Sequence, residues 1–350
     1  MNAVDFFCGG GGMTRGLIDA GINVVFGLDY NPACQATYEN NNHIPYLNRD
    51  ISQVTGTQLQ AEYPILNDTD ELLLVGCAPC QPFSSQRHSN VEHVAVNLLD
   101  EFGRLVSEIL PAHVLVENVP GIEKRGEAVF NRFLNILQEN NYAYVYGVLN
   151  AKNYGVPQNR KRLILIASRL FVPMLPTATH GEGLHAYVTV HDAIHHYPHL
   201  EAGATNENFA NHRAAALSPL NMRRIEATPQ DGGGRTAWPP ELQLSCHTNG
   251  HVGHTDVYGR MAWDQVSPTL TSKCFSLSNG RFGHPEQNRA ISLREAASLQ
   301  SFPDDYTFEG SLQEIGKQIG NAVPVLLAHR IGEQILVSHT NFLAQQNNEE

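Results

Sequence analysis

The sequence lacks the features that mark membrane, secreted and disulfide-stabilised proteins. Its 350 residues contain no long apolar run, and since a membrane-spanning helix needs about 18 or more consecutive apolar residues, none is expected. The first ten residues, MNAVDFFCGG, lack the basic region and apolar stretch of a signal peptide. Only six cysteines occur, and in a reducing cytosol they are expected to be free thiols. We therefore expect a cytoplasmic protein.

Positive charge is also scarce. The chain has 23 Lys and Arg residues against 35 Asp and Glu, a net charge of −12, which argues mildly against a nucleic-acid partner. The charge is uneven, because residues 151–285 hold 12 basic against 9 acidic residues and 11 of the 17 histidines. This middle region is the only part that could offer a cationic face, although chance variation explains the asymmetry equally well before motifs are considered.

The first half of the chain alternates apolar segments typical of buried strands with segments whose apolar residues recur at helical spacing. Strands are expected near residues 4–7, 23–28, 72–75, 114–116 and 163–166, and helices near 14–20, 94–110 and 130–137. This alternation predicts an α/β fold with a doubly wound, mostly parallel sheet covered by helices on both faces.

The pattern changes at the segment Val172-Pro173-Met174-Leu175-Pro176. From there to about residue 290 the chain is rich in Gly, His, Asn, Ser and Pro, which indicates a second, irregular domain. Helical signals return at Ser292, which forms a capping box with Glu295, and again after Pro324. Residues 345–350 are polar and are expected to be disordered.

Four consecutive glycines, Gly9–Gly12, follow the first expected strand. In a doubly wound sheet this turn often holds a ligand, and a backbone without Cβ atoms can approach one closely. Asp29 ends the second expected strand, where a carboxylate can bind a ribose hydroxyl. A nucleoside-containing cofactor is therefore predicted, with a tight turn that binds nothing as the alternative. The dinucleotide fingerprint fails because Thr14 and Arg15 stand where its third glycine would be, and no P-loop pattern occurs.

Cys77 and Cys80 follow the strand expected at 72–75 and are separated by two residues. Cys246 and Cys274 are too far apart to complete a zinc site, so no metal is predicted. Three interpretations remain open: a redox pair, one catalytic cysteine at the carboxyl end of the strand, and two small buried side chains.

Charged residues follow or precede two further strands. Glu117 ends the strand expected at 114–116, at the same sheet edge as the glycines and cysteines. A lone glutamate there is usually a solvated loop residue, but three reactive features at one edge favour a site. Arg160 and Arg162 alternate before the last strand and so share a face. They suit a phosphate or the polar edge of a base, or else form a solvated basic loop.

Together, these segments resemble the C5-cytosine DNA methyltransferases. The matching segments are, in chain order, DFFCGGGG, GLDY, Asp50-Ile51, PCQPFS, ENVPG, QNRKR, RAISLREAASLQSFPD and IGNAVP. Their order and spacing are far more specific than any one of them, and they cover most of the chain. Gly10 departs from the larger residue that the family often has in the first motif. Residues 171–288 fall where the family keeps its target-recognition region.

The resemblance implies a class I methyltransferase, Rossmann-like fold. Residues 1–170 and 310–350 would form the catalytic, cofactor-binding domain, and residues 171–309 the target-recognition domain. The implied reaction transfers a methyl group from S-adenosylmethionine to C5 of a flipped-out cytosine in a specific duplex DNA sequence, leaving S-adenosylhomocysteine. The expected protein is a monomer of bacterial or phage type, with a cognate restriction endonuclease as a separate partner protein.

The resemblance also assigns residues. Cys80 would add covalently to C6 of the base, Glu117 would engage N3 and the exocyclic amine, and Arg162, beside Arg160, would lie near O2. The residues implied to bind the cofactor are Phe7, Gly9, Gly11, Gly12, Asp29, Tyr30, Asp50, Ile51, Pro79, Asn321 and Ala322. Three other functions remain as alternatives: a tRNA cytosine-C5 methyltransferase of the same fold, a thiol oxidoreductase using Cys77 and Cys80, and an inactive DNA-binding module.

Overall fold

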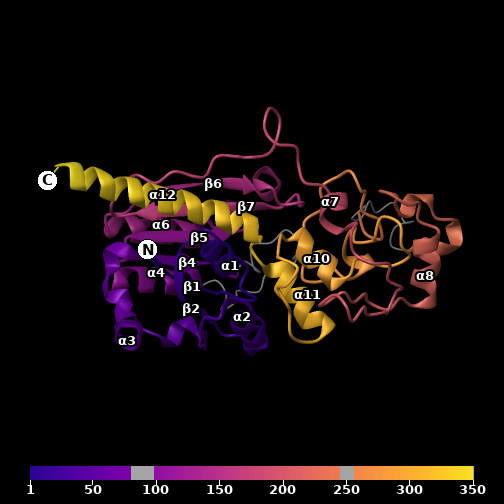
Figure 1. The fold of residues 1–350 in the computed structure, drawn as a ribbon, viewed down its shortest axis with the longest axis horizontal. Helices are drawn as coiled ribbons and strands as arrows, with labels where there is room; N and C mark the ends of the chain where they lie inside the picture. Colours follow the sequence, from indigo (N-terminus) through magenta and orange to yellow (C-terminus); the bar gives the residue numbers. More distant parts are fainter. Residues whose placement is uncertain (80–97, 245–255, 350) are drawn as a thin grey trace. The chain divides into compact units, whose positions relative to one another are not determined.

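The structure, a computed structural model, describes residues 1–79, 98–244 and 256–349 (Figure 1). The chain divides into two compact units. The first comprises Met1–Asn150, Lys161–Ala178 and Val325–Glu350, and the second comprises Ala151–Arg160 and Thr179–Pro324. Within the described residues, no helix is both long and apolar enough to cross a membrane.

The first unit is built on a seven-stranded sheet with the order β3-β2-β1-β4-β5-β7-β6. Its strands are β1 Asn2–Phe6, β2 Asn23–Asp29, β3 Tyr46–Asn48, β4 Leu72–Gly76, β5 His113–Asn118, β6 Ala143–Asn150 and β7 Lys161–Ser168. Strands β1 to β5 pair in parallel, whereas β7 runs antiparallel to both β5 and β6. Strands β4 and β5 are buried throughout, as expected of central strands covered on both faces. The predicted doubly wound, mostly parallel sheet is confirmed.

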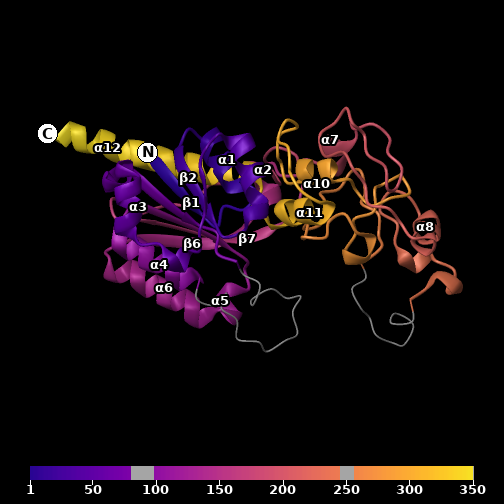
Figure 2. The same cartoon turned by 90° about the horizontal axis from the view of Figure 1, so that it is seen from below.

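Helices cover both faces of this sheet. They are α1 Gly12–Asp19, α2 Gln35–Asn42, α3 Gly56–Glu62, α4 Leu98–Ile109, α5 Ile122–Arg125, α6 Glu127–Glu139 and α12 Val325–Glu349. Figure 2 shows α1 and α12 on one face and α4, α5 and α6 on the other. The core is formed by apolar side chains of the central strands and of α4 and α6, among them Phe6, Phe102 and Phe133.

Helix α12 begins directly after Pro324, as predicted, and returns the end of the chain to the first unit. It packs against α1, where Gly16 lies so close that an added Cβ atom would be 2.5 Å from the Ala328 Cβ atom. The prediction that residues 345–350 are disordered was wrong for most of that segment, because the helix continues to Glu349. Polar residues at a helix end are compatible with helix when the preceding turns are anchored by packing.

The described residues of the second unit form little regular structure. The helices among them are α7 Val190–Ile194, α8 Pro219–Glu226, α10 Leu293–Leu299 and α11 Leu312–Asn321. The capping box predicted at Ser292 and Glu295 is confirmed at the start of α10. A small apolar cluster surrounds Trp238.

Buried arginines stabilise this irregular unit. Arg260, 1% exposed, donates hydrogen bonds to the carbonyls of Ile225, Thr228, His284 and Gln287. Carbonyls that lack a partner in a sheet or helix need another donor when buried, and guanidinium groups supply five each. Four of the twelve basic residues between positions 151 and 285 are buried, namely Arg160, Arg224, Arg235 and Arg260. The net charge of this region therefore overstates any cationic face.

Candidate active site

The glycine turn connects β1 to α1 and leaves space beside its backbone. Gly9 and Gly11 have φ angles of 50° and 86°, in the left-handed region that glycine adopts without strain. A Cβ atom added to Gly9 would meet no described atom within 4 Å. The backbone N–H of Phe7 donates to the Leu28 carbonyl at 2.7 Å, which holds the turn against β2. Gly12 is the first residue of α1 and is buried.

Asp29, the last residue of β2, fixes this turn through its carboxylate. One oxygen accepts a hydrogen bond from the Gly9 N–H at 3.0 Å, and the other accepts one from the Asn31 N–H at 2.9 Å. Burial raises the pKa of Asp29, and the bonds from backbone N–H groups oppose this shift. Each carboxylate oxygen can accept a second hydrogen bond, so Asp29 can also accept hydrogen bonds from ribose hydroxyls.

The other predicted cofactor residues of the first unit follow neighbouring strand ends. Tyr30 succeeds Asp29 and its side chain is 70% exposed, so its ring is available for stacking. Asp50 caps a short 3₁₀ helix through the Ser52 N–H, and Ile51 is buried. Pro79 is half-buried after β4. An open glycine backbone, a hydrogen-bonded carboxylate and an exposed ring fit an adenosine-containing cofactor.

Asn321 and Ala322 belong to the second unit. Asn321 ends α11 and is exposed, and Ala322 is half-buried. Their predicted contact with the cofactor remains a prediction.

Of the two cysteines of the C-x-x-C segment, the structure describes only Cys77. Cys77 follows β4, and its N–H donates to the Phe6 carbonyl at 3.3 Å. Burial raises the pKa of the Cys77 thiol well above its ordinary value, and the charges of Asp5 and Glu117 add to the shift. Because the thiolate is the reactive form of cysteine, Cys77 is poorly suited to redox chemistry. Cys80 lies outside the described residues, so its role as nucleophile remains a prediction.

Glu117 and Arg162 form an ion pair at the edge of the sheet. Arg162 Nε lies 2.8 Å from Glu117 Oε1, and the two side chains are 14% and 11% exposed. Glu117 is the penultimate residue of strand β5, and Arg162 is near the start of the antiparallel β7, where Leu163 pairs with Asn118. The structure therefore brings together two residues that are 45 positions apart by sequence number and that were both predicted for the site.

Asn118 connects this ion pair to the loop that leads to Cys80. Its Nδ2 donates to the Ala78 carbonyl at 3.2 Å, and its Oδ1 accepts from the Val119 N–H at 2.9 Å. The sequence analysis assigned Asn118 no role. Its position directly after Glu117, at the end of an apolar strand, was the available signal that it belongs to the site. The loops after β4 and β5 are thereby joined within the first unit.

Asp5 is a second residue that sequence reasoning missed. It is fully buried in β1, where a charged residue in an apolar strand was the available signal. Thr14 Oγ1 donates to Asp5 Oδ2 at 2.7 Å and lies 3.0 Å from the Tyr38 hydroxyl. Burial raises the pKa of Asp5 to about 7, and the Thr14 bond opposes this shift.

Arg160 differs from its predicted neighbour Arg162. It belongs to the second unit and is 2% exposed. Its guanidinium donates to the carbonyls of Leu270, Gly320 and Ala322. This geometry favours a role in holding the backbone over the predicted contact with the base.

The arrangement of strands explains why these features meet. Strands β1, β4 and β5 are adjacent and parallel, so the glycine turn, the Cys77–Pro79 loop and Glu117 all lie at their carboxyl ends. The chain order reverses between β1 and β4, and ligands of open α/β sheets bind outside the carboxyl ends at such a switch point. A carboxylate held by a guanidinium at this edge can bind the N–H groups of a planar heterocycle.

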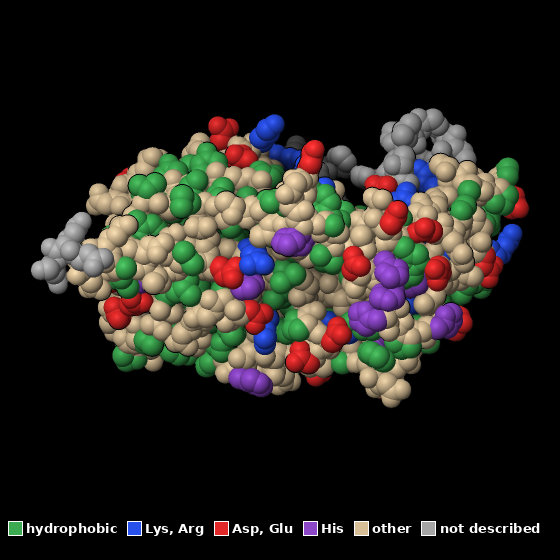
Figure 3. All heavy atoms as spheres, turned by 45° about the horizontal axis from the view of Figure 1, so that its top comes forward, with side chains coloured by type: hydrophobic (Ala, Val, Ile, Leu, Met, Phe, Trp, Pro, Cys, Tyr) green, Lys and Arg blue, Asp and Glu red, His purple; other side chains and the backbone are tan. Residues whose placement is uncertain are grey.

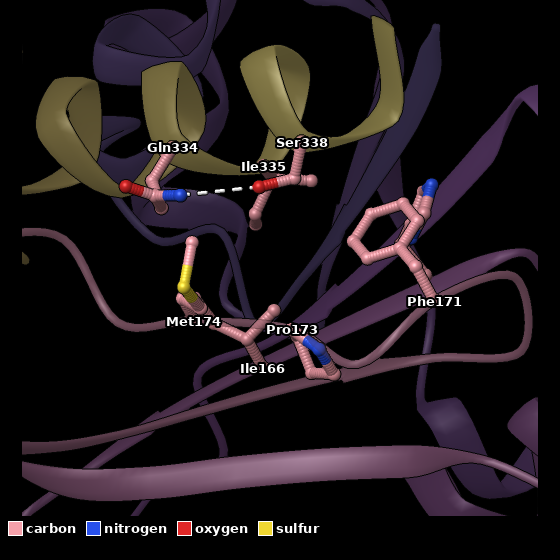
Figure 4. Close-up of a pocket in the computed structure, with 8 residues that line it drawn as sticks. Ile166, Phe171, Pro173, Met174, Gln334, Ile335 and Ser338 are labelled. Carbon is pink, nitrogen blue, oxygen red and sulfur yellow. Dashed lines mark hydrogen bonds between the residues drawn. The ribbon is translucent and has the colours of Figure 1, made fainter. Parts of the chain in front are cut away.

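Two other features of the surface lie outside the predicted site. A small depression lies between α12 and the segment after β7, lined by Ile166, Phe171, Met174 and Ser338 among others (Figure 4). Histidine side chains gather on the face shown in Figure 3, and the His191 and His195 rings stack with centroids 4.0 Å apart. In the part of the chain that the structure describes, no group of three His, Cys, Asp or Glu side chains is arranged to hold a metal ion.

Comparisons with known proteins place this chain in a family. The family model for C-5 cytosine-specific DNA methylase matches residues 1–337. The Type II methylase M.HgiDII of Herpetosiphon aurantiacus is 43% identical over 339 residues, which cover 95% of this chain and 94% of the relative. The Type II methyltransferase M.PspPI of Psychrobacter sp. is 32% identical over 342 residues, which cover 95% and 78%.

Solved structures agree in fold. A putative DNA modification methyltransferase encoded within an E. coli prophage matches with a TM-score of 0.73 at 22% identity, covering 97% of this chain and 99% of the other. Spodoptera frugiperda DNMT2, in a mutant form, matches with a TM-score of 0.63 at 18% identity, covering 97% and 99%. From its motifs, its strand-edge site and the family match over nearly its whole length, the chain belongs to the C-5 cytosine-specific DNA methylase family.

Proposed function

We propose that this protein transfers the methyl group of S-adenosylmethionine to C5 of a cytosine within a specific sequence of duplex DNA. Membership of the family makes the chain a DNA cytosine-5-methyltransferase. The observation that carries the detailed proposal is the Glu117–Arg162 ion pair at the carboxyl edge of the sheet, one strand away from the loop that leads to Cys80.

The cofactor would bind at the glycine turn. The open backbone at Gly9 and Gly11 suits its methionine and adenosine parts, Asp29 suits the ribose hydroxyls and the exposed Tyr30 ring suits the adenine. Phe7, Gly12, Asp50, Ile51, Pro79, Asn321 and Ala322 are proposed as further contacts. When bound, S-adenosylmethionine supplies an electrophilic methyl group.

The proposed chemistry begins with the Cys80 thiolate, which adds to C6 of cytosine and makes C5 nucleophilic. Glu117 holds a proton at N3 as charge develops on the ring, and Arg162 fixes the carboxylate in place. Once C5 carries the methyl group, a base removes the C5 proton, the electron pair of that C–H bond restores the ring double bond and Cys80 leaves as thiolate. Asn118 supports these steps by fastening the loop before Cys80 to the end of β5.

Residues 171–309, most of which belong to the second unit, are proposed to recognise the target sequence. Extruding a base from a duplex costs a few kcal/mol, which contacts from this unit would offset. We further propose that the protein acts as a monomer in the cytoplasm and protects DNA from a separately encoded endonuclease.

Methylation assays with labelled S-adenosylmethionine test this proposal. Duplex DNA and tRNA are offered side by side, and bisulfite sequencing of DNA from cells that express the chain identifies the modified cytosines. We expect methylation of duplex DNA in one sequence context and none of tRNA. Methylation of tRNA alone would support the alternative enzyme and contradict the proposal.

A further inference from the structure

Arg160 lies in a buried hydrogen-bond network of the second unit. Its Nη1 donates to the Leu270 carbonyl at 2.9 Å, and its Nη2 donates to the carbonyls of Gly320 and Ala322 at 3.1 and 3.0 Å. One planar guanidinium thus joins two backbone segments that are 50 residues apart in the sequence. This is a use for which the rigid fork of arginine is suited and a lysine ammonium is not.

Two fully buried glutamines extend the network to the same segments. Gln158 accepts a hydrogen bond from the Leu270 N–H at 3.0 Å, and its Nε2 donates to Gln300 Oε1 at 3.0 Å. Gln300 in turn donates to the Ile319 carbonyl at 2.6 Å. Gln158 and Arg160 can act together because residues two apart on an extended segment face the same way.

The network supplies donors that the end of α11 lacks. In an α-helix the Gly320 carbonyl would accept from the N–H four residues later, but that residue is Pro324, which has none. Arg160 provides the missing donor and places positive charge at the negative end of the helix dipole. Helices α10 and α11 lie side by side in both views (Figures 1 and 2).

Gly320 permits this close approach. A Cβ atom at Gly320 would lie 2.2 Å from the carbonyl carbon and oxygen of Thr271, so any side chain there would push α11 away from the segment that Arg160 also holds. The position of the end of α11 therefore depends on two independent features. Arg160 binds its carbonyls, and Gly320 leaves room for the Thr271 backbone beside it.

We propose that Arg160 is a positioning residue that holds the Asn321–Ala322 segment in the conformation that binds the cofactor. This inference rests on the proposed function, in which Asn321 and Ala322 contact S-adenosylmethionine. Arg160 acts through the backbone of α11 and touches neither the cofactor nor the base.

Calorimetric titration of the full-length protein with S-adenosylmethionine tests the proposal. Three variants are compared with wild type: Arg160→Lys, which keeps the charge but loses the fork; Gly320→Ala, which displaces α11 without changing charge; and Arg224→Lys as the matched control. Arg224 is another buried arginine of the second unit and donates to the Leu242 carbonyl at 3.1 Å, away from α11. Melting temperatures are measured for all.

We expect Arg160→Lys and Gly320→Ala each to raise the Kd at least about tenfold, the effect of losing about 1.4 kcal/mol of binding free energy. KM for the cofactor should rise in parallel, with kcat largely recovered at saturation. Arg224→Lys should lower the melting temperature yet leave the Kd unchanged. If either Arg160→Lys or Gly320→Ala does not fold, the other variant carries the test.

Equal Kd values in all four proteins would overturn the positioning role, and so would a Kd in Arg224→Lys raised as much as in Arg160→Lys. Failure of wild type itself to bind S-adenosylmethionine would instead contradict the proposed function. The two failures are therefore distinguishable.

Discussion

Glu117 is the described side chain on which the proposed chemistry depends most directly. Its carboxylate is paired with Arg162 at 2.8 Å and is mostly shielded from solvent, so the ion pair holds the carboxylate in position. A carboxylate can accept hydrogen bonds from two N–H groups of the base. An amide has only one acceptor oxygen, and its nitrogen is a donor, so it cannot make the same pair of hydrogen bonds.

Replacing Glu117→Gln should lower the methylation rate by about 100-fold or more, the usual contribution of a positioned acid–base group. The Kd for S-adenosylmethionine should stay near the wild-type value, because the proposed cofactor residues are untouched. Single-turnover methylation of duplex DNA measures the rate. The matched control Glu123→Gln alters an exposed glutamate of α5 and should behave as wild type; an unimpaired Glu117→Gln enzyme would refute the assigned role.

Asp5 provides a test based on pH. Its pKa is raised from 3.8 to about 7 by burial, so between these pH values the folded state binds a proton that the unfolded state has lost. Asp5 therefore makes the free energy of unfolding fall as pH rises from about 4 to 7, by at most about 4 kcal/mol at about 1.4 kcal/mol per pKa unit.

The variant Asp5→Asn should remove this pH dependence. Denaturant unfolding of the cofactor-free protein at pH 5 and pH 8 would show the variant gaining stability relative to wild type at the higher pH. A difference between the two proteins that does not change with pH, or that changes in the opposite direction, would show that Asp5 is ionised in the folded protein.

Among the structural elements, those with uniform apolar composition could be predicted best. Strands β4 and β5 read as continuous apolar runs because they are buried on both faces. Strands β3 and β6 were not predicted, because β3 has only three residues and β6 is a half-buried edge strand. The antiparallel direction of β7 was not predicted either, since direction depends on connections and leaves no mark in the composition of a strand.

The crossing of α1 and α12 yields a prediction about stability. A Cβ atom at Gly16 would lie 2.5 Å from both the Ala328 Cβ atom and the Val325 carbonyl oxygen. Gly16→Val should therefore destabilise the protein by about 1–3 kcal/mol through overpacking. Chemical denaturation measures the loss.

The control for this substitution is Asn341→Val, at an exposed position of α12. Asparagine and valine have similar helix propensities, so this surface substitution should change the free energy of unfolding by less than about 0.5 kcal/mol. Equal effects of the two substitutions would mean that the helices do not meet closely at Gly16.

Across the whole molecule, the sequence predicted which motifs follow the sheet strands better than it predicted which basic side chains are exposed. The carboxyl ends of β1, β4 and β5 could be identified because short motifs follow apolar strands. The partners of Arg160 and Arg162 could not, since alternation shows that two side chains share a face without showing what that face meets: Arg162 pairs with Glu117, whereas Arg160 holds the backbone of α11. The cationic face expected from residues 151–285 is reduced because buried arginines satisfy carbonyls in the second unit.

The most direct test of the account compares the two cysteines of one segment. Cys77→Ser and Cys80→Ser variants are expressed in cells whose DNA is then bisulfite-sequenced, and each purified protein is incubated with 5-fluorocytosine DNA and S-adenosylmethionine. We predict normal methylation and a covalent protein–DNA complex for Cys77→Ser, and neither for Cys80→Ser. Methylation by Cys80→Ser, or its loss in a folded Cys77→Ser protein, would contradict the assignment of Cys80 as the nucleophile.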